Sequence, residues 1–178
     1  GIGEKNSKIT FFVNGSIIGT TTADSEGFFT FTPSNKLADG EYSIKATSTD
    51  SAGNVSDKST PIPITIDTTS PVSPSSLTNI SDANISTPTF TGKSEANSEV
   101  TLLNGDVVLG TATTDNDGNF SITLTSALED GEYSLTAKAS DTAGNISSIS
   151  SSLVVTIDTV APQAPTSLTQ ISDANDSI

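Results

Sequence analysis

The chain repeats itself with a period of 91 residues, and this period restricts the fold more than any other feature of the sequence. Leu-Ala-Asp-Gly-Glu-Tyr at 37–42 returns as Leu-Glu-Asp-Gly-Glu-Tyr at 128–133, and Asp-Ser-Ala-Gly-Asn at 50–54 returns as Asp-Thr-Ala-Gly-Asn at 141–145. A unit of this size is large enough to hold its own core, whereas the roughly 20–50-residue repeats of solenoids need their neighbours. The sequence therefore predicts a tandem array of separate domains.

The register of the repeat predicts where these domains begin and end. Gly1 aligns with Gly92, and Ile178 aligns with Thr87. With no initiator Met and no signal-like start, the chain is expected to be an internal fragment of a longer protein. The expected parts are a repeat without its first two strands at 1–66, a complete repeat at 67–157, and a linker with the lead-in of a third repeat at 158–178. We expect the first repeat either to fray or to be completed by the carboxy-terminal segment of a neighbouring molecule.

Acidic side chains dominate the charge. The 21 Asp and Glu residues outnumber seven Lys, which gives a net charge of −14. Such a field repels nucleic acid and anionic lipid and attracts cations, although acidity can also serve only to keep a protein soluble. No apolar run approaches the roughly 20 residues that a membrane helix needs. We therefore expect no nucleic-acid partner and no membrane insertion.

The missing residue types restrict the chemistry. Cys and His are absent, which excludes disulfides and leaves paired carboxylates, as in glycosidases, as the remaining catalytic groups. A catalytic pair seldom needs copying in every repeat, and a chain with no Trp and two Tyr offers few aromatic platforms for a sugar. We expect that the chain is not an enzyme.

Apolar residues alternate with period two, which indicates half-buried strands. Tyr133, Leu135, Ala137 and Ala139 fall on one face of one such strand, and the pattern recurs one repeat earlier. In the complete repeat we predict strands at 73–80, 88–93, 99–104, 106–112, 119–126, 132–140 and 151–158.

Turn signals between these strands predict how they are connected. Asn104-Gly105 is a two-residue hairpin signal, and Asn14-Gly15 is its counterpart in the first repeat. Tyr133 stands at the start of the sixth strand, where the tyrosine corner of immunoglobulin-like domains lies. The predicted fold class is all-β, with tandem seven-stranded antiparallel immunoglobulin-like β-sandwiches.

Several of these motifs together resemble those of the bacterial immunoglobulin-like repeats of giant calcium-dependent RTX-type surface adhesins, which are exported by type I secretion. The motifs are Ile-Asp-Thr-Thr-Ser-Pro at 66–71, Ile-Asp-Thr-Val-Ala-Pro at 157–162, Thr-Pro-Thr-Phe-Thr-Gly-Lys-Ser-Glu at 87–95, Asn-Gly-Asp-Val-Val-Leu-Gly at 104–110, Thr-Asp-Asn-Asp-Gly-Asn-Phe at 114–120 and Ala-Ser-Asp-Thr-Ala-Gly-Asn-Ile-Ser at 139–147.

The resemblance implies an extracellular spacer on the bacterial surface, stiffened by Ca²⁺ near its joints, that extends an adhesive tip away from the cell. Its partners would be the adjacent repeats, with a host or surface ligand bound only by a distal domain. The first repeat departs from the second, because Ser25-Glu26 replaces Asn116-Asp117 and Phe28 replaces Asn119. The alternative function is a recognition domain whose loops bind a carbohydrate or a protein.

The strand order also predicts where acidic turns meet. If the strands run alternately up and down, the turns after the second, fourth and sixth strands share the pole that the incoming linker reaches. The oxygen donors expected at this pole are Asp67, Glu95, Asp115, Asp117, Asp141 and Asn145. Those expected at the opposite pole are Asp82, Asp106, Asp130 and Asp158.

Such donors suit Ca²⁺, which takes roughly six to eight oxygens at about 2.3–2.6 Å. Zn²⁺ is disfavoured by the lack of His and Cys, and Mg²⁺ by its reluctance to lose water. Asp and Asn also favour turns for backbone reasons alone, so Asp115 and Asp141 are equally interpreted as turn-closing residues. The sequence is compatible with both interpretations.

Overall fold

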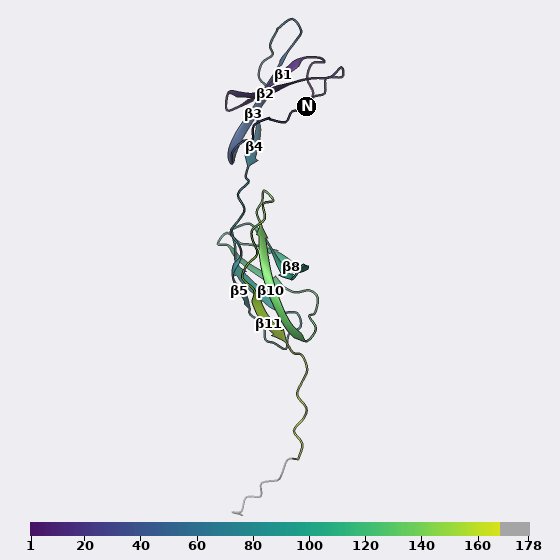
Figure 1. Cartoon of the computed structure of the whole chain (residues 1–178), viewed down its shortest axis with the longest axis vertical. Helices are drawn as coiled ribbons and strands as arrows, with labels where there is room; N and C mark the ends of the chain where they lie inside the picture. The colour runs from purple at the N-terminus through teal and green to yellow at the C-terminus, as the bar shows by residue number, and fades with distance from the viewer. Residues whose placement is uncertain (168–178) are drawn as a thin grey trace, which may run out of the picture. The chain divides into compact units, whose positions relative to one another are not determined.

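Antiparallel strands make up all of the regular secondary structure in residues 1–167, the part of the chain that the computed structural model describes (Figure 1). The predicted all-β class is confirmed. The chain forms two compact units, one of Gly1–Pro71 with Ser140–Ile146 and one of Val72–Ala139 with the chain from Ser147 on. We refer to strands β1–β4 and their loops as the first repeat, and to β5–β11 and their loops as the second repeat. None of the described residues forms a helix that could cross a membrane.

The second repeat has two sheets. One has the order β5-β6-β9, and the other has the order β11-β10-β7-β8. The strands are β5 (Ser75–Asn79), β6 (Thr89–Lys93), β7 (Glu99–Asn104), β8 (Val107–Thr113), β9 (Asn119–Thr123), β10 (Gly131–Ser140) and β11 (Leu153–Ile157). Each of the seven predicted ranges overlaps one of these strands.

The core of the second repeat lies between its two sheets. Phe90 of β6, Leu102 of β7 and Leu135 of β10 are fully buried and belong to one apolar cluster. Ala137 and Ala139 continue the buried face of β10, so the predicted alternation of this strand is confirmed. Burial of this apolar face between the two sheets stabilises the sandwich through the hydrophobic effect.

The hairpin between β7 and β8 corrects one detail of the sequence prediction. Asn104 pairs with Val107, so the turn residues are Gly105 and Asp106, not Asn104 and Gly105. A two-residue hairpin turn needs a positive φ at its first position, and Gly105 supplies it with φ 58°. In the first repeat Asn14 and Gly15 are the turn residues as predicted, because Val13 pairs with Ser16.

Each repeat contains the predicted tyrosine corner. The hydroxyl of Tyr133 donates to the backbone oxygen of Glu129 at 2.9 Å, and the hydroxyl of Tyr42 donates to that of Ala38 at 2.9 Å. These bonds fix the turn before the long strand of each repeat, β10 and its counterpart β3 (Gly40–Thr49).

The first repeat has one four-stranded sheet in the order β2-β1-β3-β4. Its other strands are β1 (Lys8–Val13), β2 (Ser16–Thr22) and β4 (Ile62–Ile66), and they stand at the positions of β7, β8 and β11. The edge strand β4 contains Pro63, and proline is tolerated at a sheet edge because it cannot donate to a ladder on both sides.

A facing sheet is absent from the described part of the first repeat. Residues 28–32, the counterpart of β9, make only an isolated bridge between Phe28 and Ile2. As a result Ile44 is only half-buried in β3, whereas its counterpart Leu135 is fully buried. The predicted completion of this repeat by the carboxy-terminal segment involves residues 168–178, which lie outside the described residues.

Candidate functional site

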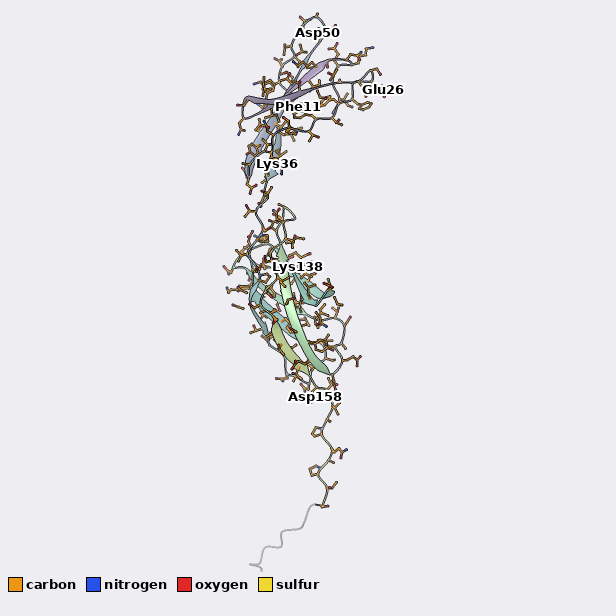
Figure 2. All side chains as sticks on the ribbon, viewed as in Figure 1. Phe11, Glu26, Lys36, Asp50, Lys138 and Asp158 are labelled. Atoms are coloured by element: carbon orange, nitrogen blue, oxygen red, sulfur yellow. The ribbon has the colours of Figure 1, made fainter. Side chains whose placement is uncertain are left out.

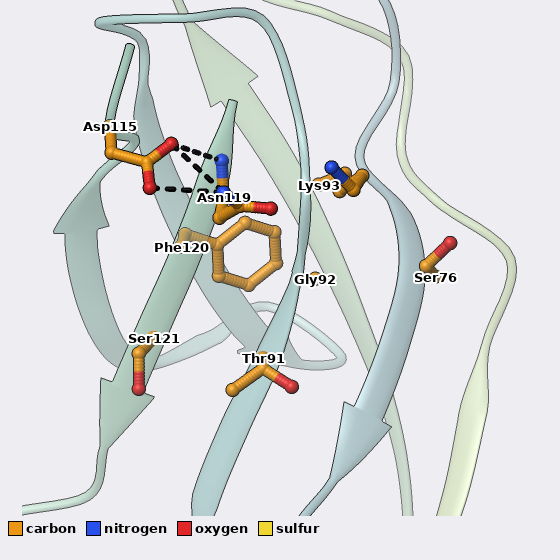
Figure 3. Close-up of a pocket in the computed structure, with 8 residues that line it drawn as sticks. All are labelled: Ser76, Thr91, Gly92, Lys93, Asp115, Asn119, Phe120 and Ser121. Atoms are coloured by element: carbon orange, nitrogen blue, oxygen red, sulfur yellow. Dashed lines mark hydrogen bonds between the residues drawn. The ribbon is translucent and has the colours of Figure 1, made fainter. Parts of the chain in front are cut away.

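The turn after β8 is closed by the carboxylate of Asp115. Its Oδ1 accepts the backbone N–H groups of Asp117 at 2.9 Å and of Asn119 at 2.7 Å. The side-chain amide of Asn119 donates to both carboxylate oxygens, at 3.2 Å and 3.0 Å (Figure 3). These bonds, the side chain of Asn119 first, hold the pKa of Asp115 below its ordinary value because they favour the charged form.

The loop after β10 is built in the same way around Asp141. Its Oδ1 accepts the backbone N–H groups of Ala143 at 2.9 Å and of Asn145 at 2.8 Å, and its Oδ2 accepts the Asn145 side chain at 2.8 Å. The Asn145 side chain, as the main cause, lowers the pKa of Asp141. Asn145 Nδ2 also donates to the backbone oxygen of Asp67 at 3.1 Å, within the same compact unit. Three predicted ligands thus form one hydrogen-bonded group.

The first repeat contains both turns, with one difference. Asp50 accepts the backbone N–H groups of Ala52 and Asn54 and the Asn54 side chain, which lowers the pKa of Asp50. Asp24, the counterpart of Asp115, accepts only two backbone N–H groups, at 2.9 Å each, because Phe28 stands where the second repeat has Asn119. Asp50 and Lys36 lie at opposite ends of this repeat (Figure 2).

A further carboxylate in each repeat holds the start of the outgoing linker. Oδ1 of Asp39 accepts the backbone N–H of Thr68 at 3.0 Å and its hydroxyl at 2.8 Å, and Oδ2 accepts the hydroxyl of Thr69 at 2.7 Å. In the second repeat Oδ1 of Asp130 accepts the backbone N–H of Thr159 at 2.9 Å and its hydroxyl at 2.8 Å. We call this arrangement the linker clamp. Hydrogen bonds from Thr69 and then Thr68 lower the pKa of Asp39.

The remaining predicted ligands make local bonds of their own. The carboxylate of Asp158 accepts the backbone N–H of Val160 at 3.1 Å, and its backbone N–H donates to the oxygen of Ala83 at 2.9 Å. Asp82 accepts the backbone N–H of Ile85 through its own backbone oxygen at 3.1 Å. These bonds place Asp82 and Asp158 at the same end of the second repeat, where β11 ends (Figure 2).

These acidic residues do not gather into a dense cluster. Among residues 1–167, no three acidic, His or Cys side chains stand close enough to one another to hold one metal ion. The carboxylates instead face amide and hydroxyl donors, which is the arrangement expected of turn-closing residues. The donor types suit a hard cation such as Ca²⁺, but these carboxylates alone are too few to surround it.

One family model matches each of the two repeats. The model of the bacterial immunoglobulin-like domain matches residues 1–68 and 72–159. The chain belongs to the bacterial immunoglobulin-like domain family. The two matched segments of this bacterial immunoglobulin-like chain end at Thr68 and Thr159, the threonines of the two linker clamps, so each clamp lies at the end of its domain.

The bacterial immunoglobulin-like chain is also similar to solved structures. It is 25% identical to a tetra-tandem repeat in the extending region of a large adhesion protein, with a TM-score of 0.41, over 87% of this chain and 42% of that one. It is 27% identical to the BSP domain of a biofilm-associated protein, with a TM-score of 0.41, over 89% of this chain and 26% of that one. It therefore spans less than half the length of either.

One further likeness concerns the fold alone. The FN1–FN3 domains of chicken CNTN1 are 12% identical, with a TM-score of 0.50, over 86% of this chain and 57% of that one. A search of curated proteins gave no match.

Sequence reasoning missed the role of the linker clamp. Asp130 was expected among the metal ligands, and its counterpart Asp39 was not singled out at all. The signal was present, because Asp-Gly before the long strand and Asp-Thr after the last strand recur together in both repeats. Only the pairing of β10 with β11, which sets Gly131 opposite Ile157, shows that the two motifs meet.

Proposed function

We propose that this chain is a structural spacer of a bacterial cell-surface adhesin, exported to the cell exterior, that projects a distal binding tip. The observation that carries the proposal is the linker clamp, in which an Asp holds the backbone N–H and hydroxyl of a Thr at the start of the outgoing linker, at nearly the same distances in both repeats. A spacer benefits from fixed joints, because every freely rotating linker shortens the average reach of the array.

The residues after the clamp add to this restriction. Pro71 and Pro162 stand three residues after Thr68 and Thr159, and the proline ring fixes φ. The direct partners of the chain are therefore adjacent repeats of the same protein, and a host or surface ligand is bound by a distal domain. The family and the absence of His and Cys both fit a role without catalysis.

The proposal includes Ca²⁺ as a second restraint on the joints, after export by the type I route used by RTX-type adhesins. Its support is the net charge of −14 and the bonds that join Asn145 to Asp67 and Asp130 to Thr159. Asp67, Asp115, Asp117, Asp141 and Asn145 are the candidate ligands at the pole that the strand order predicts for the incoming linker. Asp82, Asp130 and Asp158 are the candidates near the outgoing linker.

Backbone carbonyls and water would have to complete either set of ligands. Extracellular modules commonly bind Ca²⁺ with dissociation constants of roughly 10⁻⁴–10⁻³ M, so such sites fill outside the cell and stay empty in the cytosol. A site whose Kd is a hundredfold below the ambient concentration contributes about 2.7 kcal/mol to the bound arrangement.

Distance measurements between spin labels on the two repeats test the clamp. The chain has no Cys, so Thr20→Cys with Thr111→Cys gives one exposed label at the same position of each repeat. Asp39→Ala removes the clamp of the linker between the labels and is expected to broaden the distance distribution. Asp130→Ala removes the clamp beyond both labels and is the matched control. Equal widths for the two variants would reject a role of the clamp in holding the joint.

The same labelled chain tests Ca²⁺ separately. Addition of Ca²⁺ is expected to narrow the distribution, and a chelator is expected to reverse this change. Asp141→Ala should abolish the effect of the ion, whereas Asp50→Ala, at the matching turn of the first repeat, should leave it. No calorimetric heat and no narrowing at millimolar Ca²⁺ would reject the ion and leave the clamp as the joint's restraint.

A further inference from the structure

The sheet of the first repeat carries a hollow with two lysine side chains, which we call the lysine hollow. Its volume is about 240 Å³, and its lining comes from β1, the turn after β1, β3 and the loop before β4. The lining residues are Phe12, Asn14, Gly15, Ser43, Lys45 and Lys58. None of them carries a carboxylate, although 21 acidic residues stand against seven Lys in the chain. The lysine hollow is therefore a cationic spot on an acidic protein.

The lysine hollow lies on the outer face of this sheet. Phe12 pairs directly with Lys45, and directly paired residues of antiparallel strands point to the same side. Phe11, the next residue, points to the other side because side chains alternate along a strand. The counterpart of Phe11 in the second repeat is Leu102, which belongs to the core between the two sheets. The sheet of β5, β6 and β9 thus packs on the inner side and leaves the outer face open.

Both lysines are placed by their neighbours. Nζ of Lys58 lies 4.6 Å from the centroid of the Phe12 ring, within the range of about 6 Å for a cation–π contact. Lys45 stands beside the same ring in the neighbouring strand. Ser43, two residues earlier on the same side of β3, adds a hydroxyl, and Asn14 adds an amide. Two ammonium groups with such hydrogen-bond donors beside them suit one carboxylate.

The second repeat has the same surface without the lysines. The 91-residue period aligns Lys45 with Thr136, Lys58 with Ile149, and Gly15 with Asp106. The counterpart surface therefore has no cation among these positions and gains a carboxylate at its turn. Because the strand order β8-β7-β10-β11 matches β2-β1-β3-β4, the fold itself does not require lysine at either position.

A second hollow adjoins the lysine hollow and carries the opposite charge. Asn14 and Ser43 line both, and Glu41 lines only the second. Glu41 precedes Lys45 by four residues on the same side of β3, which is about 13 Å along the strand. A ligand that lies along both hollows is complementary if it has a negative group at the lysines and hydrogen-bond donors at Glu41. A second negative group near Glu41 would be repelled.

We propose that the two hollows bind an acidic saccharide, with the carboxylate of a uronic acid at Lys45 and Lys58 and the hydroxyls of a neighbouring neutral sugar at Glu41. The lysine hollow lies over β1 and β3, each of which has a strand on either side. An extended peptide that binds by strand addition needs a free edge and has none there. The net charge of −14 disfavours a ligand with many negative charges. This binding site goes beyond the spacer function and does not depend on it.

Titration of the whole ¹⁵N-labelled chain with a disaccharide of glucuronic acid and glucose tests the proposal by nuclear magnetic resonance. We expect shift changes at Asn14, Ser43 and Lys45. The counterpart surface of the second repeat is the control within the same molecule and should not respond. The neutral disaccharide of two glucoses lacks the carboxylate and should bind at least about tenfold more weakly, because hydrogen bonds to charged groups are the stronger ones.

Exchange of the two lysines for their counterparts provides the matched variant. Lys45→Thr with Lys58→Ile should weaken binding of the acidic disaccharide at least about tenfold, while the spectrum of the first repeat stays dispersed. If the double variant unfolds, Lys45→Thr alone decides the question and should give a smaller loss of affinity in a folded chain.

Four results would overturn the proposal. Absence of shift changes at millimolar acidic disaccharide means that the hollows have no affinity for it, and undiminished binding by a folded lysine variant means that the saccharide binds elsewhere. Equal binding of acetate means that the lysines attract any small anion. Tighter binding of a peptide of residues 114–120, which carries two Asp, means that an acidic protein segment is the ligand.

Discussion

A matched pair of core truncations tests whether the two repeats differ in stability as their burial indicates. Leu135→Ala removes a fully buried side chain of β10, and Ile44→Ala removes its half-buried counterpart of β3. A buried Leu→Ala change costs about 2–5 kcal/mol, from the lost transfer of the side chain and the cavity left behind. We expect Leu135→Ala to lower the free energy of unfolding by about 3.5 kcal/mol, because the site is fully buried and solvent cannot fill the cavity that the truncation leaves.

The cost at Ile44 should be about 1–2 kcal/mol, because solvent already reaches the side chain and its partner Ile62 is 61% exposed. For a domain of this size, 3.5 kcal/mol corresponds to a fall of about 15–25 °C in the melting temperature of the second repeat. The first repeat, with less apolar burial, should melt first in the unmodified chain.

Fluorotyrosine labelling can follow both repeats in one sample, because Tyr42 and Tyr133 are the two tyrosines of the chain and each reports on one repeat. Thermal and urea unfolding curves are recorded for each resonance in the unmodified chain and both variants. The reasoning is refuted if Ile44→Ala lowers the midpoint of Tyr42 as much as Leu135→Ala lowers that of Tyr133. It is also refuted if Leu135→Ala costs less than about 1 kcal/mol, since full burial would then carry no penalty.

Three further outcomes follow from the turns. Gly118→Ala should destabilise the second repeat more than Gly105→Ala in urea titrations, because both glycines have a positive φ but only at Gly118 would a Cβ meet the backbone oxygen of Ser94. If Asn145 restrains Asp141 instead of binding the ion, calorimetry should show tighter Ca²⁺ binding in Asn145→Ala; weaker binding would make Asn145 a ligand. The urea midpoint should be level from pH 7 to about 5 and fall only as the pH drops below the ordinary Asp pKa of 3.8. A carboxyl whose pKa is lower in the folded than in the unfolded protein stabilises the fold above its unfolded pKa, and this stabilisation is lost as the pH falls through its folded pKa. Asp→Asn changes should flatten that fall at the four carboxyls with lowered pKa, which are Asp39, Asp50, Asp115 and Asp141.

The strands and corners could be predicted because local pattern and packing agree there. The alternation of Leu135, Ala137 and Ala139 predicts one buried face, and only a second sheet can bury it. The Tyr before this face could be assigned to a tyrosine corner because its place at the start of the strand is part of the motif.

The hairpin register could not be predicted from the turn residues alone. Asn-Gly is the strongest short hairpin signal, yet Asn104 remains in β7 and pairs with Val107. A shift of register between Leu102 and Leu103, matched by one between Phe11 and Phe12, sets the phase of the hairpin before the turn is reached. The shift is the same in both hairpins, and the 91-residue period aligns Asn14 and Gly15 with Gly105 and Asp106, so comparison of the two repeats gives the turn that the Asn-Gly pair alone misplaces.

The acidic residues were ambiguous for a different physical reason. A carboxylate that closes a turn and one that binds Ca²⁺ both need a short side chain with two acceptor oxygens, so Asp is the natural choice for either. The structure bears out the turn at Asp115 and Asp141, where amide donors occupy the oxygens. Whether an ion displaces those donors depends on the free-energy difference between the hydrogen-bonded and the ion-bound carboxylate, and residue types alone do not determine this difference.

The position of these carboxylates along the long strands links the two ends of each domain. Asp130 immediately precedes β10 and holds the outgoing linker, and Asp141 immediately follows β10 and is bonded through Asn145 to the backbone of Asp67. A strand of 10 residues is about 33 Å long, and β10 is paired on both sides, with β7 and β11. It cannot change its length without breaking the core. The turns of Asp130 and Asp141 are therefore held apart by a strand that the core keeps at a fixed length.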